Sequence, residues 1–183
     1  ASAVAILIET AKALGPLSRY AMVFAAFNTE EPPYLRTPLM GSQFFVGHLP
    51  AEIGSPPNFQ AVVIMDLMGG VHWPPLKNAV FGAGAEKSPG LYRRFKQAAG
   101  PGEGLAVLPV GMHLIEEMPV VGQVAFSDYH PFRNASVPHL FLSAGRTPRY
   151  HRASDLPGTL HYERMAATVP WLQALIRGID QVA

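Results

Sequence analysis

Residues 20–33 read YAMVFAAFNTEEPP, and this stretch decides the expected fold. Residues 20–27 are apolar without interruption by a charged or amide side chain. A short continuous apolar run is typical of a strand that is buried on both faces of a sheet. The polar loop that follows places two adjacent carboxylates, Glu30 and Glu31, just beyond the end of the expected strand.

Other apolar runs of strand length follow, at residues 59–65, 78–83, 105–108 and 137–142. They alternate with segments of helical pattern: residues 1–14, a helix beginning near Gly41-Ser42, residues 88–99, and residues 162–182 with a kink at Pro170. This alternation predicts an α/β three-layer sandwich, with a mixed, mostly parallel sheet and helices on both faces. Because no linker or repeat divides the sequence, residues 1–183 are expected to form a single domain.

The composition is that of a globular domain and excludes several classes of function. Of the 183 residues, 15% are charged, and the net charge of +1 gives no electrostatic basis for binding nucleic acid. No apolar run reaches the ~18 residues that a membrane span requires. The sequence has no cysteine, which excludes disulfides and thiolate chemistry within it and leaves the compartment undecided.

Polar clusters follow the expected strands, at the edge where open α/β sheets bind ligands. Glu30 and Glu31 follow the first strand, Asp66 ends the second, and His151 lies in the loop after the last. Each has an ordinary structural alternative: a turn-forming Asp, a solvated Glu pair, and a hydrogen-bonded loop His. Together, carboxylates and an imidazole at one sheet edge are ligands suited to zinc or a similar divalent ion.

Four blocks of sequence carry a family resemblance: FAAFNTEEPPYLRTPLMGS, AVVIMDLMGG, SDYHPF and PRYHRASD. In this order they closely resemble the co-catalytic zinc exopeptidases, which include bacterial leucyl-type aminopeptidases, glutamate-carboxypeptidase-like proteins and glutaminyl cyclases. The resemblance implies a metallo-aminopeptidase that hydrolyses peptides at a free N-terminus. It also implies a Zn2+ cofactor, with a pair of zinc ions per site in intact relatives.

The resemblance also implies a role for each candidate residue. Glu30 resembles the general base that takes a proton from the metal-bound water. Glu31 and His151 resemble ligands of the first metal, and Asp66 resembles a ligand of the second. Three further residues are expected behind the ligands or against the substrate: Asp128, Tyr129 and Tyr150.

One departure from the family pattern affects the expected activity. In this family the second-metal His and the bridging Asp precede the first helix, and Ala1-Ser2-Ala3 aligns with the end of the segment that carries the Asp. We therefore expect the given residues to hold one zinc ion or none and to lack appreciable peptidase activity. Two alternatives stay open: a glutaminyl cyclase-type acyltransferase, and a degenerate, non-catalytic domain kept for binding or assembly.

The upstream segment of this family also contributes strands to the sheet. Without those N-terminal strands, residues 20–27 would lie at an edge with unpaired backbone groups and no charged side chain to block another chain. We therefore expect this chain to form a homo-oligomer rather than a stable monomer.

Overall fold

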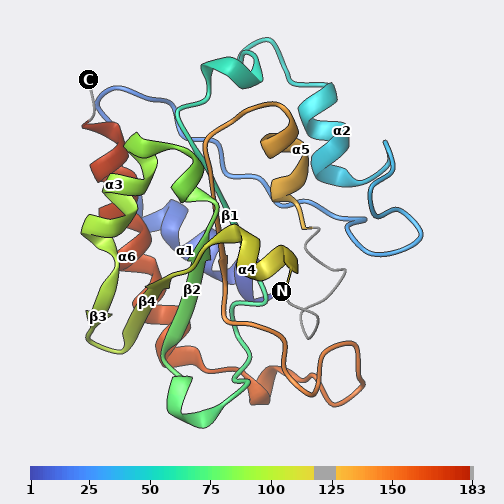
Figure 1. Cartoon of the computed structure of the whole chain (residues 1–183), viewed down its shortest axis with the longest axis vertical. Coiled ribbons are helices and arrows are strands. Elements are labelled where there is room, and N and C mark those ends of the chain that lie inside the picture. Colours follow the sequence, from blue (N-terminus) through green and yellow to red (C-terminus); the bar gives the residue numbers. More distant parts are fainter. Residues whose placement is uncertain (118–126, 182–183) are drawn as a thin grey trace.

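The structure is a computed structural model that describes residues 1–117 and 127–181 (Figure 1). The described residues form a five-stranded sheet of order β1-β5-β2-β4-β3. Its strands are β1 Val62–Asp66, β2 Ala79–Ala83, β3 Gly100–Gly102, β4 Leu105–Pro109 and β5 His139–Ser143. The β1–β5 and β2–β4 pairs are parallel. The β2–β5 and β3–β4 pairs are antiparallel. The mixed sheet of the α/β prediction is thus confirmed.

Helices cover both faces of this sheet, as predicted. They are α1 Ser2–Leu14, α2 Gly41–Gly47, α3 Pro89–Ala98, α4 Met112–Glu117, α5 Tyr129–Asn134 and α6 Tyr162–Asp180. Short 3-10 turns span Pro56–Asn58, Pro74–Leu76, Ala85–Lys87 and Pro157–Thr159. In Figure 1, α1, α3 and α6 gather on one side of the sheet, and α2 and α5 lie together on the other. None of the helices in the described part of the chain is both long and apolar enough to cross a membrane.

Two apolar cores result, one on each face of the sheet, and β5 supplies side chains to both. Leu140 and Leu142 belong to the core under α1, α3 and α6, whereas Phe141 between them belongs to the core under α5. Successive side chains of a strand point to opposite faces, so a strand covered on both sides needs apolar residues at every position. This explains why residues 140–142 are apolar without alternation, although β5 begins with the buried polar residue His139.

The four later apolar runs coincide with β1, β2, β4 and β5, with ends shifted by a few residues. Helix α6 continues through Pro170 as expected, and Val182 at its predicted end lies outside the described residues. The sequence patterns did not predict β3, α4 or α5. These elements are too short for a hydrophobic period to be recognised, and α5 also contains Pro131.

Residues 20–27 are the exception, because the predicted buried strand was wrong. The segment is irregular, and Met22, Val23 and Phe24 are 39%, 46% and 37% exposed. A cavity of about 360 Å3 separates it from the edge strand β1, and both segments line that cavity. The apolar pattern encodes burial, but a ladder also needs a neighbouring strand within hydrogen-bonding reach, and no described residue provides one here.

The entry to this segment is held by a buried carboxylate at the end of α6. Asp180 accepts hydrogen bonds from the Ser18 backbone N–H (2.8 Å) and hydroxyl (2.7 Å), and from the N–H groups of Arg19 and Tyr20 (both 3.0 Å). These donors hold the pKa of Asp180 well below its usual range, because they stabilise the ionised form. The last turn of α6 therefore fixes the start of residues 20–27 against the domain.

We expect Asp180→Asn to destabilise the fold at neutral pH, because an amide cannot accept all four of these hydrogen bonds. A lowered pKa in the folded state means that the stabilisation is present above the unfolded pKa and declines as the pH falls below about 4. Urea unfolding measured from pH 7 to pH 3 should therefore show that the difference in free energy of unfolding between wild type and Asp180→Asn becomes smaller in acid. The exposed Asp155→Asn is the matched control. A difference in free energy of unfolding that stays constant with pH would contradict the lowered pKa of Asp180.

Candidate metal site

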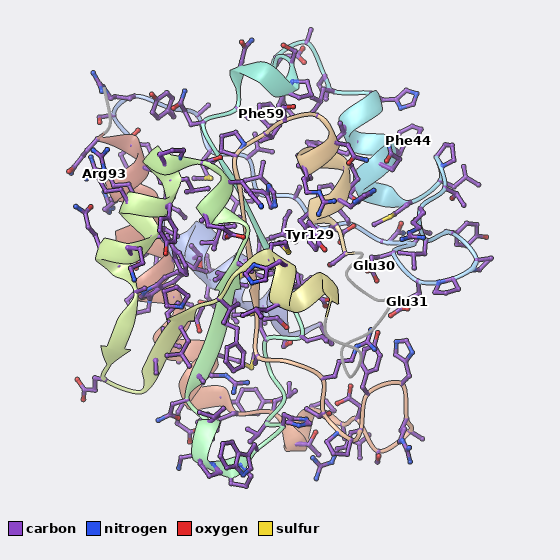
Figure 2. All side chains as sticks on the ribbon, viewed as in Figure 1. Glu30, Glu31, Phe44, Phe59, Arg93 and Tyr129 are labelled. Carbon is purple, nitrogen blue, oxygen red and sulfur yellow. The ribbon has the colours of Figure 1, made fainter. Side chains whose placement is uncertain are left out.

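The sheet topology brings three separate segments to one edge. β1 and β5 are parallel, and Asp66 is in register with Ser143, so both strands end at the same edge. The loop that follows β5 carries His151, and the irregular segment 20–27 leads directly to Glu30 and Glu31. Figure 2 shows the two glutamates side by side, on the side of the molecule where Figure 1 labels α2 and α5.

Glu31 and His151 are in direct contact, although 120 positions separate them in the sequence. His151 Nε2 lies 2.7 Å from Glu31 Oε1, and the Tyr150 hydroxyl lies 3.4 Å from the same oxygen. The rings of Tyr150 and His151 stack with their centroids 3.8 Å apart. The side chains of His151 and Glu31 are 56% and 53% exposed, so a ligand from solvent can reach both.

The backbone at this edge adopts an unusual conformation at each contributing segment. Thr29 (φ 55°), Leu67 (φ 52°) and His151 (φ 57°) lie in the left-handed region, which non-glycine residues seldom occupy. The first precedes Glu30, the second follows Asp66, and the third is itself a candidate ligand. Such conformations cost of order 1–3 kcal/mol each and concentrate at functional sites. The fold therefore holds these side chains in place at an energetic cost.

Carboxyl groups crowd together at this edge, and their pKa values rise. Burial first, and then the neighbouring charges of Asp66, Glu31 and Asp128, raise the pKa of Glu30 to about 7, against the opposing charge of Arg146. Burial likewise raises the pKa of Asp66, although the Leu67 N–H that donates to Asp66 Oδ1 (2.8 Å) partly offsets it. Desolvation and mutual repulsion both disfavour the ionised forms, so a bound cation would relieve this strain.

Asp128 and Tyr129 lie at the beginning of α5 and have different surroundings. Burial raises the pKa of Asp128, and its Oδ1 atom is buried without a hydrogen-bond partner among the described residues. Tyr129 is 1% exposed and packs in the core, stacked on His139 at 5.8 Å and against Phe141 (Figure 2). Asp128 thus belongs to the acidic cluster, whereas Tyr129 supports it from the interior.

Arg146 is a member of this site that the sequence patterns did not reveal. Its guanidinium lies over the Tyr150 ring, 4.7 Å from the centroid. Its charge lowers the pKa values of Glu30, Asp66 and Tyr150. Its position five residues before His151 was the available signal, but a single Arg in a loop is too common to be informative.

The described residues fit zinc only in part. Across residues 1–117 and 127–181, no three His, Cys, Asp or Glu side chains are grouped closely enough to hold a metal ion. Glu31 and His151 are the two candidate ligands in contact, and their separation of 2.7 Å is shorter than the roughly 3.4 Å expected between two ligands of one tetrahedral zinc. These two side chains would have to separate slightly to admit an ion.

The fold is similar to those of two bacterial aminopeptidases of known structure. A zinc aminopeptidase from Bacillus subtilis aligns with a TM-score of 0.68 and 19% identity, over 96% of this chain and 40% of that protein. The Legionella pneumophila LapA aminopeptidase aligns with a TM-score of 0.54 and 18% identity, over 79% of this chain and 36% of that protein. This chain thus spans well under half the length of either enzyme.

The model of Peptidase family M28 matches residues 1–174, and the chain belongs to that family. The resemblance drawn from the four sequence blocks is thereby confirmed. A search of the curated proteins found no match.

We expect the raised pKa of Glu30 to make the metal-free chain less stable as the pH rises from about 4.5 to about 7. In that interval the folded state binds more protons than the unfolded state, so the free energy of unfolding falls with pH. Glu30→Gln should flatten the pH dependence of the thermal midpoint between these values, whereas Glu103→Gln in the exposed β3–β4 turn should not. An NMR titration that places the Glu30 pKa near 4.5 would contradict the proposed environment.

Proposed function

We propose that this chain is the core of a metal-dependent aminopeptidase-type hydrolase, with Glu31 and His151 as ligands of one zinc ion. The observation that carries the proposal is the 2.7 Å contact between these side chains, next to Glu30 at a crowded acidic edge. Membership of peptidase family M28 supports a peptidase-type hydrolase. Asp66, half-buried at the end of β1, is the proposed ligand of a second ion.

Glu30 is the proposed general base. A pKa of about 7 lets this carboxyl group accept and return a proton near neutral pH, as general acid–base catalysis requires. Its neighbour Glu31 is directed to His151, so adjacent residues divide the metal-binding and proton-transfer roles. Zinc, when bound, would polarise the scissile carbonyl and lower the pKa of its bound water.

The described residues supply an incomplete ligand set, and we propose that they bind zinc weakly and hydrolyse peptides poorly on their own.

We expect titration with zinc at neutral pH to show weak binding that Glu31→Gln or His151→Gln reduces by about tenfold or more. His48→Gln, an exposed imidazole on the end of α2, should leave zinc affinity unchanged. Parallel assays with a leucine anilide and an N-terminal glutamine peptide should show no appreciable turnover. Hydrolysis of the anilide within about tenfold of an intact relative would contradict the incomplete ligand set, and cyclisation of the glutamine peptide would favour the glutaminyl cyclase alternative.

We also propose that the chain self-associates through residues 20–27. These residues carry exposed apolar side chains, and two apolar residues of α1 are exposed as well, Val4 at 40% and Ile8 at 47%. β1 is an edge strand of the described sheet, and its free edge faces the apolar cavity beside residues 20–27. Unpaired edges and exposed apolar patches favour pairing with another chain.

We expect light scattering at micromolar concentration to show a species larger than the monomer. Val23→Asp should lower the measured mass toward that of the monomer, because a charge on residues 20–27 opposes apolar association. Leu39→Asp is the matched control, since Leu39 is 65% exposed and does not line the cavity. A sharp monomeric species of the wild-type chain would contradict self-association.

A further inference from the structure

The backbone of Arg146 is fixed between the loops that follow β1 and β5. Gly145 turns the chain at φ 85°, and His72 Nδ1 donates to the Arg146 carbonyl oxygen at 2.6 Å. The two loops pack tightly, because a Cβ at Gly70 would lie only 2.3 Å from Thr147 Cγ2. Arg146 therefore leaves the backbone at a defined point, next to the acidic edge.

The side chain of Arg146 is held beside the proposed metal ligands. Its guanidinium stacks on the Tyr150 ring at 4.7 Å, and the same ring stacks on His151 at 3.8 Å. An arginine placed on an aromatic face keeps its N–H donors available at the edge of the guanidinium plane. The contact with Tyr150 therefore holds a cation beside the candidate ligand His151.

The donors of Arg146 are not used by the described residues. Ion pairs in that part of the chain join Lys12 to Glu9, His151 to Glu31 and His161 to Glu163, and none includes Arg146. The charge of Arg146 nonetheless lowers the pKa values of Glu30 and Asp66. A half-buried guanidinium that faces a site without a paired anion is suited to bidentate binding of a carboxylate.

We propose that Arg146 binds a carboxylate of the substrate on the leaving-group side of the cleaved bond. The proposal rests on the proposed peptidase function and adds a substrate class: short peptides whose free C-terminal carboxylate reaches Arg146. The acidic cluster favours the cationic amino end of such a peptide, and the guanidinium favours its anionic end. The two ends of a short zwitterionic peptide thus match the charge pattern of the site.

The test compares binding of Leu-Gly with Leu-Gly amide, measured by calorimetry on the full chain with zinc and with a chelator instead of zinc. We expect Leu-Gly to bind about tenfold more tightly, since a charge-assisted hydrogen bond is lost in the amide. Arg146→Gln should abolish this difference without changing the affinity for the amide, and Arg146→Lys should keep part of it. Arg149→Gln, an exposed arginine of the same loop, should retain the full difference.

Leu-Asp amide distinguishes the two sources of a carboxylate. If it binds as tightly as Leu-Gly, Arg146 recognises any carboxylate at this position, and if it binds as weakly as Leu-Gly amide, Arg146 recognises the chain end. The proposal is overturned if Arg146→Gln weakens acid and amide equally, if Arg149→Gln also removes the difference, or if no peptide binds at millimolar concentration. Zinc titration of the same samples reports on the proposed function separately, because it depends on Glu31 and His151 and not on Arg146.

Discussion

Parallel pairing of β1 with β5 is the constraint on which the proposed site depends. The register that sets Asp66 opposite Ser143 makes both strands end at one edge, so the loop after β5 returns His151 to the place where Glu31 lies. Apolar burial on both faces fixes this register, because a slip of one residue would exchange Phe141 with Leu140 or Leu142 between the two cores. The chemistry at the edge is therefore specified by side chains that take no part in it.

The acidic edge is electrostatically strained. Glu30, Asp66 and Asp128 each have a raised pKa with burial as the main cause. Left-handed backbone at Thr29, Leu67 and His151 adds conformational cost at the same edge. The charge of Arg146 offsets part of the negative charge. A site that is crowded, strained and partly neutralised by a local cation is organised for a ligand rather than for stability.

The sequence predicted those elements whose apolar pattern is contained within one segment. The run at residues 137–142 gave β5, which is buried on both faces, and the run at residues 59–65 gave β1, which is mostly half-buried. Residues 20–27 have the same kind of pattern but form no strand, because pairing depends on a neighbour that a local pattern cannot report. Glu31 and His151 were predicted as site residues from the family blocks. Arg146 was not predicted, because its position beside them depends on contacts with the Tyr150 ring and with the loop after β1, which a local pattern cannot report.

The central claim is that Glu31 and His151 together hold a metal ion in this chain. X-ray absorption at the zinc edge, on the zinc-loaded chain and on His151→Gln, tests it most directly because it reports the ligand atoms themselves. The account predicts one imidazole nitrogen and carboxylate oxygens at about 2.0–2.2 Å, with the imidazole signal absent from His151→Gln. An imidazole signal that persists unchanged in His151→Gln would contradict it.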